Sequence, residues 1–431
     1  MSTLPPVADA VIVGAGAAGL MAARELKRAG RRVVVLEASK RIGGRILTLY
    51  GTNAGVPVEL GAEFIHGEAP ETRRLLDEAR LATVPVQGEH YRSDRGEMSE
   101  QGPVWKRMRL VFRHLNPGRR HDRSFEDFLA GKPGGARLKR ERDLARGFIQ
   151  GFNGADTRLI SEKSIAQQGD PTEGAADAAR IVNGYSALIE YLQRDLADDI
   201  RLGSAVRRIS WDESRVCLED RHGTQHTTRT AIIAVPLPML QDDSIEIEPE
   251  IPVVRKAARK LVMGHVVRIN VVVRERFWEK EADALSYVHA PTRPFTVWWT
   301  QHPVQAHLIT GWAGGPPALE LLESGDAEGA ALAELARAFG LKRSRLEKLV
   351  DSVHMHEWTH DPNIRGAYSY VGVGGAQASR TLARPAGDTL FLAGEAADSG
   401  TAGTVEAALV SGKRAARKAL EKLSFTVRPS H

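Results

Sequence analysis

Three glycines and one carboxylate near the start of the chain have the types and the spacing needed to bind a dinucleotide. Gly14, Gly16 and Gly19 form a G-x-G-x-x-G pattern. The first permits a tight turn, the second lets a pyrophosphate approach the backbone, and the third lets a helix pack closely. Ala18 lies in the same turn, where the free N–H groups of a helix N-terminus favour phosphate. Glu37 follows at the spacing at which a carboxylate accepts hydrogen bonds from ribose hydroxyls.

The elements that would position these residues can be predicted from the surrounding sequence. Residues 10–13 are apolar without polar alternation, which is typical of a parallel strand buried on both faces. A helix is expected from about residue 17 and is ended by Gly30, and a second strand at 33–36 leads into Glu37. The elements occur in the order that the motif requires, which indicates a Rossmann-like α/β domain.

Two arginines bracket a glycine turn just after Glu37. Arg41 and Arg45 enclose Gly43 and Gly44. Both guanidinium groups could reach the same pyrophosphate, and the glycines let the backbone pass close to it. The alternative is a basic turn on the surface. Three further blocks contain clustered glycines and carboxylates, at residues 58–67 (VELGAEFIHG), 390–395 (LFLAGE) and 403–412 (GTVEAALVSG).

With these blocks the chain resembles the flavin-containing amine oxidases, a family that includes monoamine, polyamine and L-amino-acid oxidases. The resemblance covers most of the chain, and the block at 59–67 is most similar to polyamine-oxidase-like members. It also includes residues 151–156 (GFNGAD), 182–185 (VNGY), 234–237 (AVPL), 275–278 (ERFW) and 358–362 (WTHDP). The resemblance implies a discontinuous Rossmann-like FAD-binding domain and an α+β substrate-binding domain.

The resemblance also implies which residues contact the cofactor and the substrate. It places Trp358 and Tyr368 on the substrate side of the flavin, although Thr404 stands where many relatives carry a second aromatic ring. Ala367 stands where some relatives carry a cysteine bonded to the flavin, and Cys217 is the only cysteine, so noncovalent FAD is expected. The remaining expected cofactor contacts are Gly61, Ala62, Phe64, Val206, Gly394, Glu395 and Val405.

The largest departure from the family pattern is Arg268, which stands where relatives usually carry a lysine near flavin N5. Arginine keeps the positive charge but cannot act as a base, so a dehydrogenase that uses another acceptor than O2 becomes an alternative. His66 is the polar group expected in the substrate site, the alternative being a structural histidine. Trp298, Trp299 and Trp312 line the cavity or pack in the core.

A metal site and a nucleic-acid role are not expected. His354, His356 and His360 lack the cysteines or clustered carboxylates that would complete a ligand set. The net charge of +5 comes from basic residues scattered along the chain, which is typical of a solvated surface. No membrane span or signal peptide is recognised, and a single cysteine fits the reducing cytoplasm.

The length of 431 residues suggests two domains, each assembled from separated segments. The FAD-binding domain is predicted to comprise residues 1–78, 180–250 and 376–425, and the substrate-binding domain residues 79–179 and 251–375. We expect 79–179 to be largely helical, and 251–375 to combine strands at 266–273 and 308–312 with helices at 328–339 and 346–351.

We therefore expect an FAD-dependent oxidation of a primary or secondary amine, polyamines included. The products are an imine, formed by hydride transfer to flavin N5, and H2O2 from reoxidation by O2. The alternatives are an L-amino-acid oxidase, a flavin dehydrogenase or desaturase and, in another class, a flavin-binding interaction protein with little turnover. The expected partners are a small amine and O2 or another electron acceptor, and the sequence leaves the oligomeric state open.

Overall fold

The first strand of the chain lies in the parallel part of a mixed sheet. The structure is a computed structural model, which describes residues 8–94, 96–101, 104–172, 177–280, 282–290, 294–398, 400 and 402–425. Strand β1 (Ala8–Val13) lies between β2 (Val33–Leu36) and β13 (Gln225–Ile233), parallel to both. It is almost wholly buried, as the apolar run predicts. Helix α1 (Ala17–Arg28) follows the glycine turn.

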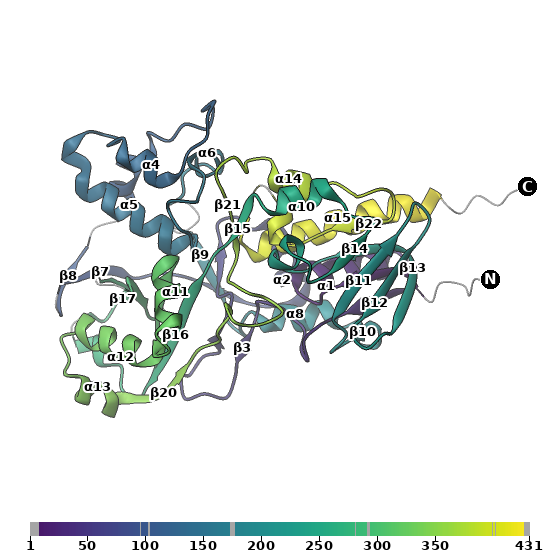
Figure 1. Cartoon of the computed structure of the whole chain (residues 1–431). Coiled ribbons are helices and arrows are strands. Elements are labelled where there is room, and N and C mark those ends of the chain that lie inside the picture. Colours follow the sequence, from purple (N-terminus) through teal and green to yellow (C-terminus); the bar gives the residue numbers. More distant parts are fainter. Residues whose placement is uncertain are drawn as a thin grey trace, which may run out of the picture.

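This first sheet draws its strands from three separated parts of the chain, so the expected discontinuity is confirmed. Its order is β10-β2-β1-β13-β12-β11-β14, and β22 pairs with β13. Helices cover both faces (Figure 1). The further strands are β10 (Ile200–Arg201), β11 (Val206–Trp211), β12 (Val216–Asp220), β14 (Glu246–Glu248) and β22 (Leu390–Leu392). The covering helices are α2 (Pro70–Ala79), α8 (Ser186–Gln193), α9 (Pro238–Gln241), α10 (Pro252–Ala258), α14 (Ala378–Leu382) and α15 (Val405–Phe425).

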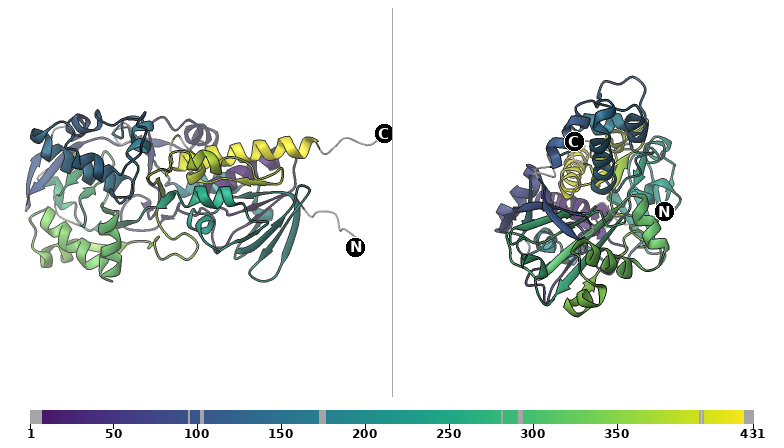
Figure 2. Two further views of the ribbon diagram at one scale, coloured as in Figure 1. Left: turned by 45° about the horizontal axis from the view of Figure 1, so that its top comes forward. Right: turned by 90° about the vertical axis from the view of Figure 1, so that its left-hand side faces the viewer.

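A second sheet forms the other half of the elongated molecule (Figure 2). Its order is β20-β16-β19-β18-β17-β7-β8. One face packs on α11 (Pro316–Glu323), α12 (Ala327–Ala338) and α13 (Arg343–Leu349). The strands are β7 (Glu89–Asp94), β8 (Glu97–Glu100), β16 (Val266–Val273), β17 (Leu285–His289), β18 (Val297–Trp299), β19 (Leu308–Gly314) and β20 (Val350–His354).

A helical cluster and three small sheets complete the described fold. The cluster packs around buried phenylalanines and comprises α3 (Val104–Phe112), α4 (Phe125–Ala130), α5 (Lys139–Phe152) and α6 (Glu162–Gln167). The small sheets pair β3 (Thr48–Leu49) with β4 (Val58–Glu59), β15 (Leu261–Met263) with β21 (Ser369–Val371), and β9 (Ala178–Ile181) with both β5 (Phe64–His66) and β6 (Thr83–Pro85). Short 3₁₀ turns lie at Ala136–Leu138, Ala197–Asp199, Phe277–Lys280 and Glu395–Ala397.

The mixed α/β class is confirmed, and so are the strands predicted at 266–273 and 308–312 and the helix at 328–339. Two local predictions are partly wrong. The segment 79–179, expected to be largely helical, also holds β6, β7 and β8, because the charged β7–β8 hairpin gains its order from pairing with the distant β17. The helix expected at 346–351 ends at Leu349, and Val350 begins a strand paired with β16.

The domain boundaries remain a prediction, and the hydrophobic cores are the observation on which they rest. Two cores flank the first sheet, a third lies under the second sheet, and a fourth fills the helical cluster. Helix α10 and β15, which the sequence assigned to the substrate-binding domain, pack in a core of the first sheet. Among the described residues, no helix combines the length and apolarity required of a membrane span.

Candidate functional site

One cavity of about 1080 Å³ extends from the first sheet to the second. Of the site residues predicted from sequence, all except Gly19 and Arg41 line it. The lining members are Gly14, Gly16, Ala18, Glu37, Gly44, Arg45, Gly61, Ala62, Phe64, His66, Val206, Arg268, Trp358, Tyr368, Gly394, Glu395, Thr404 and Val405. Residues that are spread along the whole chain therefore meet around one space.

Each of the three glycines of the G-x-G-x-x-G pattern is required for a different structural reason. Gly14 has a positive φ of 102°, and a Cβ there would lie 2.7 Å from the Ala234 carbonyl oxygen. A Cβ on Gly19 would lie 1.8 Å from the Gly14 carbonyl oxygen, so this glycine serves the close helix packing. Gly16 has ordinary extended dihedrals, and its Cβ would meet only Gly44 Cα, at 4.0 Å. No contact within the protein explains Gly16, whereas a pyrophosphate over the start of α1 does.

A buried carboxylate stands where the ribose is expected. Glu37 follows β2, and its two oxygens accept hydrogen bonds from the backbone N–H groups of Ala15, at 2.7 Å, and Ser39, at 2.8 Å. These bonds fix the carboxylate at the carboxyl end of the strand, with its side chain exposed to the cavity. We call the open space over the backbone of Gly16 the Gly16 hollow. A dinucleotide fits this hollow together with the Glu37 carboxylate and the free N-terminus of α1.

The two arginines of the glycine turn have separate partners. Arg41 donates to the carbonyl oxygens of Ile42, Gly44 and Ile46, at 2.7–3.2 Å, and does not line the cavity. It holds the turn in shape, and its contact with the cofactor remains a prediction. Arg45 does line the cavity, where it donates to the Glu395 carboxylate at 2.8 Å.

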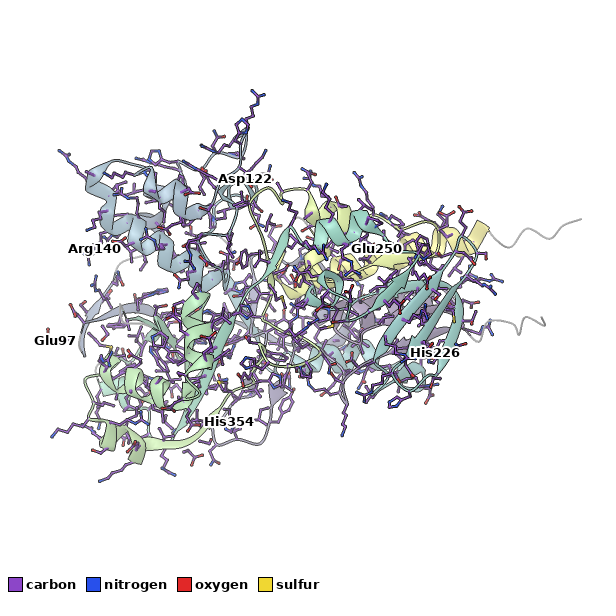
Figure 3. All side chains as sticks on the ribbon, viewed as in Figure 1. Glu97, Asp122, Arg140, His226, Glu250 and His354 are labelled. Carbon is purple, nitrogen blue, oxygen red and sulfur yellow. The ribbon has the colours of Figure 1, made fainter. Side chains whose placement is uncertain are left out.

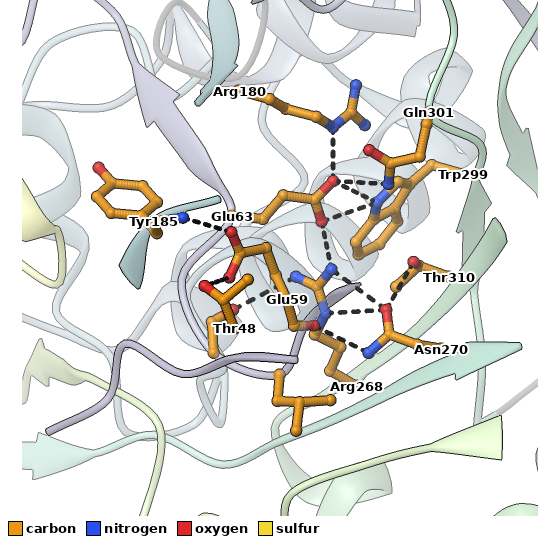
Figure 4. Close-up of polar contacts among 12 residues, drawn as sticks. Thr48, Glu59, Glu63, Arg180, Tyr185, Arg268, Asn270, Trp299, Gln301 and Thr310 are labelled. Atoms are coloured by element: carbon orange, nitrogen blue, oxygen red, sulfur yellow. Dashed lines mark hydrogen bonds and ion pairs between the residues drawn. The ribbon is translucent and has the colours of Figure 1, made fainter. Parts of the chain in front are cut away.

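A buried ionic network lies beside the middle of the cavity (Figure 4). Arg268, on β16, and Arg180, on β9, both donate to the Glu63 carboxylate, and the three side chains are at most 6% exposed. Trp299 and Gln301 also donate to this carboxylate. Burial alone would raise the pKa of Glu63, but the two arginine charges outweigh it and lower this pKa to about 2.

The N–H groups of Arg268 are therefore largely taken up by partners within the protein. Its guanidinium is paired with Glu63, donates to the Gly61 carbonyl oxygen at 3.3 Å, and contacts the Asn270 amide oxygen. These bonds hold the 61–63 segment, which lines the cavity, against the second sheet. Its proximity to the flavin remains a prediction, but the structure adds a carboxylate that the sequence reasoning did not pair with it.

The substrate side of the cavity is aromatic. Eight residues make a closed series of ring contacts, and each of them lines the cavity. The series runs Phe64, His66, Phe152, Phe148, Trp105, His90, Tyr287, Trp299 and back to Phe64, with ring centroids 4.8–6.3 Å apart. Sequence reasoning identified only three of these, Phe64, His66 and Trp299, because the others come from helices α3 and α5 and from strands β7 and β17, which meet only in the folded protein.

The remaining predicted aromatic and polar residues have specific neighbours. The Tyr368 hydroxyl donates to the Phe152 carbonyl oxygen at 2.7 Å, which fixes the ring beside the end of α5. Thr404 accepts from the Ala407 N–H and thus caps α15. Trp312 lines the cavity with Trp299, whereas Trp298 is fully buried in the core under the second sheet.

The histidines considered as metal ligands have other partners in the structure. His354 contacts Ser352, His356 contacts Asp361, and His360 contacts Glu357. Within the described ranges, no group of three or more His, Cys, Asp or Glu residues is arranged to hold a metal ion.

Comparison with known proteins identifies the family of the chain. The family model of flavin-containing amine oxidoreductases matches residues 17–420. The chain belongs to this family. Polyamine oxidase 3 of Oryza sativa subsp. japonica is 28% identical over 95% of this chain and 88% of that protein. Lysine-specific histone demethylase 2 of Homo sapiens is 26% identical over 95% of this chain, which covers only 53% of that longer protein.

Solved structures share the fold. A putrescine oxidase bound to putrescine matches with a TM-score of 0.82 at 22% identity, covering 96% of this chain and 99% of that one. Cyclohexylamine oxidase from Brevibacterium oxydans matches with a TM-score of 0.81 at 21% identity, covering 97% and 100%. The protein is thus a flavin-containing amine oxidoreductase. Its only cysteine, Cys217, lies on β12 and does not line the cavity.

The glycine analysis predicts that two substitutions have opposite profiles. Gly16→Val places its Cβ at least 4.0 Å from the nearest protein atom and fills the space left for the pyrophosphate, so we expect a folded protein with little FAD. The Cβ of Gly19→Ala collides with backbone, so we expect the free energy of unfolding to fall by roughly 1–3 kcal/mol. FAD should be lost as well. Circular dichroism melting and the absorbance ratio of flavin to protein measure the two effects. Full FAD content in Gly16→Val would contradict the placement of the pyrophosphate.

A second prediction concerns Glu59, a buried carboxyl close to the ionic network. Burial raises its pKa from 4.5 to about 7, although the Tyr185 N–H and the Thr48 hydroxyl donate to it. Because the folded pKa exceeds the unfolded one, the free energy of unfolding should fall by roughly 3 kcal/mol as pH rises from below 4.5 to above 7. The stabilising effect of Glu63 is lost only towards pH 2, outside this window.

Glu59→Gln removes the titrating group and keeps its shape, so its stability should depend less on pH between 5 and 8. Urea unfolding of the wild type and the variant at several pH values measures the difference. An identical pH dependence in both proteins would assign the titration to another group.

Proposed function

We propose that this protein oxidises a primary or secondary amine to an imine, with O2 as electron acceptor and H2O2 as a product. The observation that supports this most is the continuity of the cavity, because the hollow at Gly16 and the aromatic side around Tyr368 line the same space. FAD, when bound, accepts a hydride equivalent from the amine and passes the electrons to oxygen. Hydrolysis of the imine then yields a carbonyl compound and ammonia or a smaller amine.

The residues of the chain contribute binding and orientation to this reaction. Aromatic walls exclude water and favour the neutral form of the amine, which is the form that can give up a hydride. Tyr368 presents a ring fixed by its bond to Phe152, and His66 lies edge-on to the Phe152 ring at 5.4 Å. We propose that these two residues border the amine, so that positioning is their main contribution to the rate.

An L-amino-acid oxidase is the less favoured alternative. Such an enzyme needs a cation for the carboxylate adjacent to the amine, and the sequence offers Arg268 or an arginine of the helical segment for this role. Since the Arg268 guanidinium already donates to Glu63, Asn270 and the Gly61 carbonyl oxygen, it has no pair of N–H groups left to receive a substrate carboxylate.

Anaerobic mixing of the holoenzyme with candidate amines tests the proposal. We expect amines to bleach the visible absorbance of the flavin, and air to restore it with formation of H2O2. Bleaching by α-amino acids alone would favour the alternative oxidase. No bleaching by any amine or amino acid would support a flavin-binding protein with little turnover.

Two tyrosines allow a matched comparison of anaerobic reduction rates. Tyr368→Phe keeps the ring and loses one hydrogen bond, so we expect at most about a ten-fold loss, whereas Tyr368→Ala loses the wall and should cost about a hundred-fold. Tyr370→Phe is the control, because Tyr370 packs in the helical cluster and does not line the cavity. FAD content should stay normal in all three. Equal rates in Tyr368→Ala and the wild type would place the amine elsewhere.

A further inference from the structure

The outer end of the cavity, away from the Gly16 hollow, is made by strands that the sequence did not single out. His90 and Arg92 alternate along β7, and Tyr287 and His289 alternate along β17. The parallel register sets His90 beside Tyr287 and Arg92 beside His289, and all four side chains line the cavity. Since alternate residues of a strand share a face, one face of the second sheet presents this polar cluster to the space.

Two groups of this cluster have unused hydrogen-bonding capacity. Arg92 is half-buried, and its guanidinium makes no hydrogen bond or ion pair with any residue in the described ranges. Gln101 follows β8 and lines the same space. Its amide oxygen is buried without a partner among the described residues. A 180° rotation of the amide group places its NH2 donor at the same position. Buried polar groups normally have partners, so unpartnered ones that face a cavity indicate a polar ligand.

The histidines do not cancel or add to the charge of Arg92. His90 Nδ1 and His289 Nε2 lie 3.1 Å apart, so one ring donates to the other. Burial lowers the pKa of His289 to about 3 and also lowers the pKa of His90, which keeps both rings neutral at physiological pH. A neutral hydrogen-bonded pair presents one donor and one acceptor at its two outer nitrogens.

The carboxylates that line the cavity do not supply a free negative charge at this end. Glu63 is held by its two arginines, and Asp143, on α5, is paired with Arg146. Arg140, on the same helix, also lines the cavity, on the side of the helical cluster that faces away from the first sheet (Figure 3). Among the described residues, the outer end therefore has an excess of positive charge.

We propose that this end binds a carboxylate on the substrate, so that the substrate is an amine with an acidic group at the far end of its carbon chain. A carboxylate accepts hydrogen bonds from the Arg92 guanidinium, and its negative charge supplies the partner that the positive charge of Arg92 lacks. Its apolar chain would lie along the aromatic rings of Trp105 and Phe148. A diamine is disfavoured, because its second ammonium would meet Arg92 without a free carboxylate to receive it.

This inference rests on the proposed amine oxidation and adds only that the substrate carries a carboxylate at the far end of its carbon chain. The amine loses two hydrogens as two electrons and two protons, O2 takes them up to give H2O2, and water converts the imine to an aldehyde with release of ammonia. The tail carboxylate is unchanged in this sequence and serves only for binding.

Anaerobic stopped-flow reduction with matched substrates tests the tail. We compare 6-aminohexanoate, hexylamine and 1,6-diaminohexane, with 4-aminobutanoate and 8-aminooctanoate to vary the length. We expect the best amino acid to have a dissociation constant at least about ten-fold below that of the diamine, as a charge-assisted hydrogen bond allows. Tighter binding of the diamine than of every amino acid would overturn the proposal.

Arg92 variants tie the preference to its charge. Arg92→Gln should reduce the ratio between amino acid and diamine, and Arg92→Glu should reverse it. Arg113→Gln is the matched control, because Arg113 is exposed on the outside of the helical cluster and does not line the cavity. Flavin content and melting temperature check that each variant is folded. An unchanged ratio in Arg92→Glu would overturn the assignment.

Binding without turnover separates this inference from the proposed function. Hexanoate has the carboxylate and the chain but no amine, so it cannot be oxidised. Calorimetric titration should show binding to the wild-type holoenzyme that Arg92→Glu abolishes, even if no amine bleaches the flavin. Absence of hexanoate binding to the wild type would overturn the carboxylate site, whether or not amines are oxidised.

Discussion

The position of the cavity depends on one carboxylate buried between two arginines. Glu63 directly precedes β5, Arg180 belongs to β9, and Arg268 lies on β16 of the second sheet. Their bonds therefore connect the segment that lines the cavity with the second sheet. Removal of one partner from such a buried pair typically costs 3–5 kcal/mol, because the other charge stays buried and unpaired. The same network fixes two neighbours of Arg268. Arg268 donates to the Gly61 carbonyl oxygen and lies over the Trp299 ring, whose indole N–H donates to Glu63.

This network also decides which charges remain available to a ligand. Arg268 lies in the middle of the cavity, where the family pattern suggests a cation, yet its guanidinium already donates to Glu63, Asn270 and the Gly61 carbonyl oxygen. Arg92 lies further out and has no such partner among the described residues. The electrostatic selection of a substrate thus moves from the middle of the cavity to its outer end, where β7 and β17 meet.

The parts of the site that the sequence predicts well are those that are local in the chain. The glycine fingerprint and Glu37 are positioned by one strand, one turn and one helix, so their spacing alone indicates their place. His90 and His289 could not be paired in this way, because parallel register between β7 and β17 joins residues that are 199 positions apart. Alternation of histidine with a charged or aromatic residue in both strands was the available signal, but nothing local shows which strands are neighbours.

The two halves of the cavity are under different structural constraints. The Gly16 hollow has a reason only in the cofactor, so it should be common to enzymes that bind FAD in this way. The outer end is made instead by the β7–β8 hairpin and β17, whose side chains can change without disturbing the first sheet. The family match therefore establishes amine oxidation and the solved structures establish the fold, while the proposed choice of substrate depends on the charge at Arg92 and its neighbours.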